Sequence, residues 1–121
     1  MFELRVRRSF AAAHQLRGYS GKCEALHGHN YGVEVRVRAE KLNEVGLALD
    51  FKEIKRELDR LLDGFDHCFL NDLEPFRDEN PSAENIARAI YRALKPSVPA
   101  GASLQSVTVW ESDDAAATYW E

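Results

Sequence analysis

The stretches FELRVRRSFAAAH (residues 2–14) and HGHNYGVEVRVRA (residues 27–39) decide the fold of this chain. In each stretch apolar residues alternate with polar ones, which is the period of a β-strand with one buried and one exposed face. Arg8 breaks the first pattern, whereas the second runs without interruption from Tyr31 to Ala39. The segment between them, Gln15–Leu26, is too long for a tight hairpin turn. We therefore expect two long strands joined by a loop.

Three of the four histidines fall at the loop ends of these two strands. His14, His27 and His29 all share the apolar parity, and side chains two residues apart on a strand point to the same side. If the strands pair antiparallel, the three imidazoles converge at one end of the sheet. Three neutral imidazoles suit zinc and leave a fourth position open, whereas the plainer interpretation is partly buried histidines bonded to backbone groups. Iron or another divalent ion stays an alternative, because affinity alone does not select the metal.

The composition is that of an ordinary globular protein. The 121 residues are 45% hydrophobic and 30% charged, and they predict a single domain over residues 1–121 that buries its core without disulfides. The net charge of −4 gives no indication of nucleic-acid binding. No apolar run approaches the roughly 20 residues of a membrane span, and the N-terminus lacks the apolar core of a signal peptide. We expect a cytoplasmic protein with Cys23 and Cys68 reduced and Cys68 in the core, a disulfide between them being the alternative.

Two helices are predicted in the middle of the chain. Asp50 can cap the first, with Glu53 three residues on as in a capping box, and Gly64 ends it. Ser82 can cap the second, and Pro96 ends it. Apolar residues recur at helical spacing in both segments. These are Phe51, Ile54, Leu58, Leu61 and Leu62 in the first and Ile86, Ile90, Ala93 and Leu94 in the second.

The last third of the chain returns to an extended pattern. Leu104–Glu111 is a predicted strand with Val107 and Val109 on one face, and Ala115–Glu121 is a short closing strand. The order ββααββ indicates an α+β domain, in which two helices cover one face of an antiparallel four-stranded sheet.

Four further residues have side chains suited to acid–base chemistry. Cys23, beside Lys22 and close to the histidines, could be a fourth metal ligand, a base or nucleophile, or an inert apolar residue. Asp66 precedes His67, and a carboxylate can orient a histidine, although neighbours on an extended chain point in opposite directions. Glu111 shares the parity of a buried face, so it needs a partner such as the N–H groups of a ligand or an arginine.

Six short motifs occur in a characteristic order. FAAAH (10–14), CEALHGHNY (23–31) and LDF (49–51) are followed by DHCFLN (66–71), NPSAEN (80–85) and WES (110–112). Together they resemble the 6-pyruvoyl-tetrahydropterin synthase / 6-carboxy-tetrahydropterin synthase family over nearly the whole chain. Serine replaces a threonine in the fifth motif, and the family's C-terminal motif is usually Glu-Thr rather than Glu-Ser.

The resemblance implies a tunnelling fold. Three subunits join their sheets into a twelve-stranded barrel, and two trimers stack into a homohexamer with active sites at the subunit interfaces. It also implies that His14, His27 and His29 bind Zn²⁺ and that Cys23 acts as the catalytic base.

The resemblance further implies roles for residues around the metal. Asp66 and His67 would form a proton relay. Glu111 would anchor the pterin ring, with Ser82 and Glu84 also contacting the substrate.

The implied reaction converts 7,8-dihydroneopterin triphosphate into 6-carboxy-5,6,7,8-tetrahydropterin, acetaldehyde and triphosphate, towards queuosine and other 7-deazaguanines. The spacing Cys-x-x-x-His-Gly-His favours this branch over 6-pyruvoyl-tetrahydropterin synthesis. Glu24 leaves open a dihydroneopterin side-chain aldolase, because a glutamate near this position replaces the cysteine in some relatives. A structural zinc protein with Cys23 as fourth ligand is the alternative from another class. Arg17, Lys22 and Lys52 are candidates for contacting the triphosphate by location alone.

Overall fold

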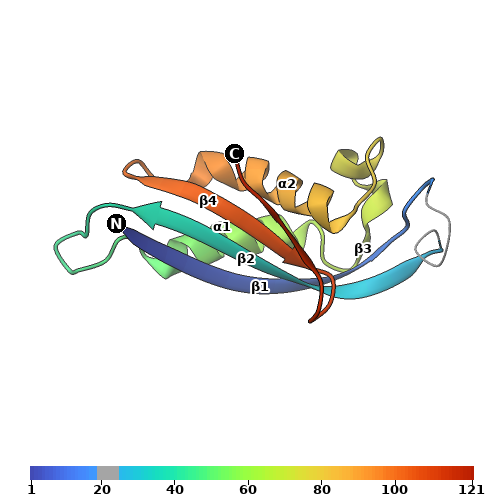
Figure 1. The fold of residues 1–121 in the computed structure, drawn as a ribbon, viewed down its shortest axis with the longest axis horizontal. Coiled ribbons are helices and arrows are strands. Elements are labelled where there is room, and N and C mark those ends of the chain that lie inside the picture. Colours follow the sequence, from blue (N-terminus) through green and yellow to red (C-terminus); the bar gives the residue numbers. More distant parts are fainter. Residues whose placement is uncertain (19–24) are drawn as a thin grey trace.

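Two long strands form the centre of the computed structural model, which describes residues 1–18 and 25–121 (Figure 1). β1 (Phe2–His14) and β2 (His27–Ala39) pair antiparallel over their whole length, from Phe2 opposite Ala39 to His14 opposite His27. The predicted strands and their antiparallel pairing are confirmed. β4 (Ala102–Trp110) pairs antiparallel with β2, and β5 (Ala116–Tyr119) pairs antiparallel with β4.

The sheet contains a strand that the sequence did not predict. β3 (Cys68–Phe69) pairs parallel with β1 at Ala12 and Ala13, so the described sheet is mixed and has the order β3-β1-β2-β4-β5. A strand of two residues has no period to detect, and only its partner defines it. The α+β class is confirmed, but four antiparallel strands was one strand too few. The strand predicted over Leu104–Glu111 begins two residues earlier and ends at Trp110, which leaves Glu111 in a bend.

Two helices, α1 (Phe51–Asp63) and α2 (Ala83–Leu94), cover one face of the sheet (Figure 1). The Asp50 carboxylate accepts a hydrogen bond from the Lys52 backbone N–H at 2.9 Å, and α1 ends at Gly64. The Ser82 hydroxyl accepts a hydrogen bond from the Asn85 N–H at 3.2 Å. Both predicted caps are therefore confirmed. Short 3₁₀ turns lie at Leu70–Asp72, Glu74–Phe76 and Lys95–Ser97.

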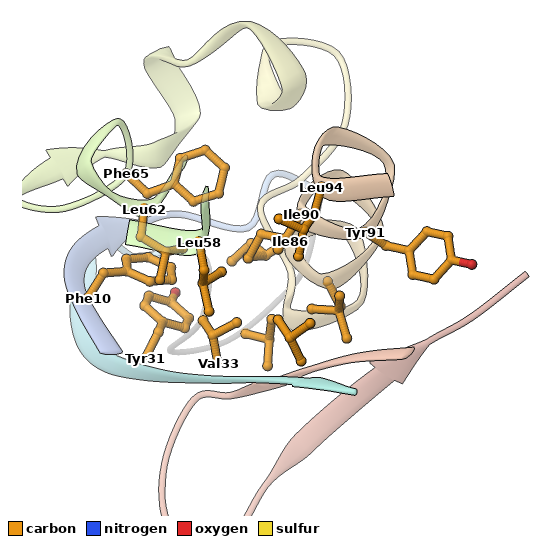
Figure 2. Packing of buried hydrophobic residues seen from close by; sticks show 14 of the residues in the cluster. Phe10, Tyr31, Val33, Leu58, Leu62, Phe65, Ile86, Ile90, Tyr91 and Leu94 are labelled. Carbon is orange, nitrogen blue, oxygen red and sulfur yellow. The ribbon is translucent and has the colours of Figure 1, made fainter. Parts of the chain in front are cut away.

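The helices and the sheet share one apolar core, part of which is shown in Figure 2. Leu58 of α1 and Ile86 and Ile90 of α2 are fully buried against the valines of β2. Two positions predicted on the apolar faces of the helices were wrong. Phe51 is 48% exposed because it lies in the first turn of α1, ahead of the packed segment, and Ala93 is exposed at the margin of the buried stripe of α2. Neither helix is long and apolar enough to cross a membrane among the residues described.

Candidate metal centre and active site

The imidazoles of His14, His27 and His29 converge at one end of the sheet. His14 lies opposite His27 in the β1–β2 register, and His29 lies opposite Ala12, one pleat further along the same face. One ring nitrogen from each histidine lies within 4.8 Å of the others, and His14 is only 1% exposed. The predicted convergence is confirmed, and it follows from strand parity and antiparallel pairing alone.

Backbone carbonyls fix the protonation of two of these rings. Nδ1 of His14 lies 2.7 Å from the carbonyl oxygen of Pro81, and Nδ1 of His27 lies 2.7 Å from that of Ala25. Because a carbonyl only accepts hydrogen bonds, both Nδ1 atoms carry the proton. In the neutral rings, Nε2 is therefore unprotonated and carries a lone pair.

These two lone pairs point at each other. Nε2 of His14 lies 2.8 Å from Nε2 of His27, a contact that needs a cation between or beside the two atoms. The Nε2 atom of His29 is buried and has no hydrogen-bond partner among the described residues. Burial is the main cause that lowers the pKa of His14 and of His29, which disfavours the charged form of these two rings. A metal ion would satisfy all three donors, so this set of residues fits one.

Asp66 and His67 form a second feature next to the end of β1. Nδ1 of His67 lies 2.9 Å from Oδ2 of Asp66, so the two side chains touch, although neighbours on an extended chain would point in opposite directions. The reason is that the chain is not extended here: His67 has a left-handed backbone with φ 57°. The backbone N–H of Ala11 donates to Oδ1 of Asp66 at 2.9 Å and is the main cause that lowers the pKa of this carboxyl, with His67 adding to it.

His67 and His29 line the same open groove, which has a volume of about 570 Å³. The side chain of His67 is 82% exposed there. Cys68 also lines the groove and is only half-buried, so its predicted place in the core was wrong. Cys23, the predicted base, and Glu24, the residue that suggests an aldolase, lie outside the described residues.

Two of the predicted substrate contacts, Glu84 and Glu111, line a separate depression of about 250 Å³ together with neighbouring alanines. Glu111 is half-buried, and its carboxylate has no ion pair or side-chain hydrogen bond among the residues described. Its charge acts to raise the pKa of His14 and His29, against the lowering by burial. Glu84 is exposed, and the hydroxyl of Ser82 caps α2. One chain therefore does not enclose the predicted metal and substrate residues in one pocket.

A more enclosed cavity of about 210 Å³ contains none of the predicted site residues. It lies between the start of α1 and the segment after α2, lined mainly by apolar side chains such as Leu49, Ile54 and Val98. The candidate site is therefore identified by its donor groups and not by the depth of a cavity.

Known proteins match this chain over nearly its full length. The model of the 6-pyruvoyl tetrahydropterin synthase family matches residues 3–121. The chain belongs to this family. A 6-carboxy-5,6,7,8-tetrahydropterin synthase from Synechocystis is 39% identical over 117 residues, covering 93% of this chain and 88% of the relative. A dihydroneopterin monophosphate aldolase from Pyrococcus furiosus is 32% identical, covering 89% and 88%.

The fold agrees with the same family. The structure of 6-pyruvoyl tetrahydropterin synthase from Caenorhabditis elegans is 31% identical and superposes with a TM-score of 0.90, covering 99% of this chain and 95% of that one. The family and fold expected from the sequence motifs are thus confirmed.

The sequence did not predict the groups that orient two of the three clustered histidines. The carbonyls of Ala25 and Pro81 orient two imidazoles, and a backbone carbonyl carries no residue signature. Asn71 and Asn80 were visible only as members of two motifs, without a role. Arg17, a candidate for the triphosphate, instead donates hydrogen bonds from its guanidinium to backbone carbonyls, among them that of Arg77 at 2.5 Å.

Proposed function

We propose that this chain is a zinc-dependent lyase that forms 6-carboxy-5,6,7,8-tetrahydropterin. With one water, 7,8-dihydroneopterin triphosphate yields this product, acetaldehyde and triphosphate, an early step towards queuosine and other 7-deazaguanines. The observation that carries the proposal is the three-imidazole donor set, with two rings fixed by carbonyls so that their lone pairs meet. Membership of the family and the Synechocystis relative support the choice of substrate and product.

His14, His27 and His29 would hold Zn²⁺, which when bound polarises side-chain oxygens of the substrate and makes the adjacent C–H bonds more acidic. His67 is suited to moving those protons. Its Nδ1–H is held by Asp66, so the exposed Nε2 is free to accept a proton and return it. Cys23 is proposed as the second proton-transfer group on the resemblance alone.

Glu111 is proposed to anchor the pterin ring. Its carboxylate lacks a partner among the described residues, and a carboxylate can accept a pair of N–H bonds from a pterin. Glu84 lines the same depression, and Ser82 would contribute through the hydroxyl that also caps α2.

The groove and the depression are both open, which supports the proposal that neighbouring subunits of a homohexamer complete each site. Analytical ultracentrifugation measures the mass of the assembly. A stable monomer that turns over substrate would contradict this part of the proposal.

A side-chain aldolase is the second candidate function. Glu24 lies beside Cys23, and the Pyrococcus relative is named as an aldolase. A 6-pyruvoyl-forming activity has the support of the Caenorhabditis structure. In both cases the metal-binding histidines keep their place and only the fate of the side chain differs.

Mass spectrometry of the products separates the three reactions. Purified protein with Zn²⁺ is incubated with 7,8-dihydroneopterin triphosphate. We expect 6-carboxytetrahydropterin and acetaldehyde, and a 6-pyruvoyl or 6-hydroxymethyl product would sink the proposal.

Cys23→Ala tests the proposed base. The variant should keep Zn²⁺ and lose turnover, and normal turnover would remove Cys23 from the mechanism. If the protein were a structural zinc protein, a cobalt-substituted sample would show a thiolate charge-transfer band, and removal of the metal would unfold the domain.

A further inference from the structure

Side chains continue the hydrogen bonding of the β1 edge beyond His14. The backbone N–H of Gln15 donates to Oδ1 of Asn71 at 2.9 Å, and Nδ2 of Asn71 donates to the carbonyl of Gln15 at 2.8 Å. Asn80 makes the same pair with Arg17, at 2.9 Å in both directions. Each amide thus reproduces the two bonds that a residue of a neighbouring strand would make. Both pairs lie in the segment that directly follows β1, at Gln15 and at Arg17.

Asn80 is directly followed by the residue that orients His14. The carbonyl of Pro81 accepts the hydrogen bond from Nδ1 of His14, and Pro81 is buried. The backbone of Asn80 is held on its other side, because its carbonyl accepts a hydrogen bond from Nδ2 of Asn85 in α2 at 2.8 Å. The short segment 80–81 is therefore tied to the strand edge through one amide and to the helix through another.

Arg17 strengthens the tie to the strand edge. Its guanidinium donates to the carbonyls of Phe76 and Glu79, the latter at 3.1 Å, and its Nε lies 3.3 Å from Oδ1 of Asn80. The segment before Asn80 is thus folded around one arginine side chain. Loss of the Asn80 amide would leave Pro81 attached to the strand only through His14 and the chain before it.

We propose that Asn80 is a positioning residue for the metal centre. Its side-chain amide holds Arg17 and thereby sets the Pro81 carbonyl against Nδ1 of His14. This keeps His14 in the tautomer whose Nε2 lone pair faces His27. The inference rests on the proposed metal-binding function and adds a group that acts on His14 through Pro81.

The zinc dissociation constant, measured by competition with a chelator, tests the proposal. Changes to groups bonded directly to a metal-ligating histidine typically weaken binding by about 10–100-fold, and because Asn80 acts through Pro81 we expect a loss at the lower end of this range for Asn80→Ala. Asn43→Ala is the matched control. The Asn43 side chain accepts hydrogen bonds from the N–H groups of Val45 and Leu47, both at 3.0 Å, in a turn outside the strands and helices. It should bind zinc like the unmodified protein.

A second variant and a second readout guard against a simple folding defect. Asn80→Asp keeps the acceptor for the Arg17 N–H and loses the donor to the Arg17 carbonyl, so it should weaken zinc binding by less than Asn80→Ala. In the zinc-free protein, long-range ¹H–¹⁵N spectra report the tautomer of His14. We expect the Nδ1–H form in the unmodified protein and a mixture of tautomers in Asn80→Ala.

The outcomes separate this inference from the proposed function. If the unmodified protein binds no zinc, the proposed function fails. If it binds zinc, and Asn80→Ala folds, binds zinc equally well and keeps the His14 tautomer, the inference about Asn80 is overturned. If Asn80→Ala does not fold, the comparison of Asn80→Asp with the unmodified protein decides in the same way.

Discussion

Replacing Tyr31 by phenylalanine should stabilise the protein. Tyr31 is fully buried, and its hydroxyl has no hydrogen-bond partner among the residues described. Burial is the main cause that raises the pKa of this hydroxyl far above its usual value. The ring itself is well packed: it stacks on Phe10 at a centroid distance of 4.9 Å and meets His14 and His29 edge-on (Figure 2 shows Tyr31 with Phe10).

The magnitude follows from the cost of an unpaired buried polar group, about 1–3 kcal/mol. Tyr31→Phe removes that cost and keeps the ring, but it leaves a small void where the oxygen was. We therefore expect the free energy of unfolding to rise by about 1 kcal/mol, the lower end of that range.

Tyr91→Phe is the matched control. Tyr91 is 3% exposed, and its hydroxyl donates to the carbonyl of Leu104 at 3.2 Å. Its removal should lower the free energy of unfolding by about 0.5–1.5 kcal/mol, so the same substitution has opposite signs at two buried tyrosines.

Urea unfolding of the zinc-free proteins measures both changes, provided that the m-values stay equal. A loss of stability for Tyr31→Phe as large as that for Tyr91→Phe would refute the reasoning, because the Tyr31 hydroxyl would then be bonded in the folded protein.

Three further changes test other parts of the structure. Asp66→Asn removes a carboxylate whose pKa lies below its ordinary value of 3.8. Because the folded-state pKa is lowered, its contribution to stability is present above that pH and is lost as the pH falls, so urea unfolding should show a deficit near neutral pH that vanishes in acid. His29→Ala removes one of the three imidazoles that would bind zinc. Zinc at a hundredfold excess over its dissociation constant should stabilise the unmodified protein by about 2.7 kcal/mol. The same zinc concentration should stabilise the variant by much less, which thermal unfolding measures. Leu58→Ala, at a fully buried position of α1, should cost about 2–5 kcal/mol in urea unfolding at an unchanged m-value.

The long strands and the meeting of the histidines could be predicted because they depend on a short-range rule. Side chains alternate along a strand, so a buried face fixes which residues point the same way. Once β1 and β2 pair as a hairpin, His14 must lie near His27 and His29. The helix caps at Asp50 and Ser82 are equally local and were equally predictable.

The features that escaped prediction depend on contacts between distant segments. β3 exists only because Cys68 and Phe69 pair with Ala12 and Ala13. The contact between Asp66 and His67 requires a left-handed residue. Two hydrogen bonds to Ala11 accompany that geometry. The backbone N–H of His67 donates to the carbonyl of Ala11, and the backbone N–H of Ala11 donates to the carboxylate of Asp66. No pattern within residues 66–68 indicates either event.

The groups that orient the candidate metal ligands also explain what the site could do. His14 and His27 donate to the carbonyls of Pro81 and Ala25, and a backbone carbonyl is one of the groups that commonly orient a metal-ligating histidine. Neutral imidazoles and neutral carbonyls add no negative charge, so the ligands themselves would not reduce the charge of a bound divalent ion. A site that must acidify C–H bonds gains from such an uncompensated charge, whereas thiolate or carboxylate ligands would weaken it. The same argument favours the proposed role of Glu111 at the substrate over a role as metal ligand, since a fourth, anionic ligand would close the site and cancel part of that charge.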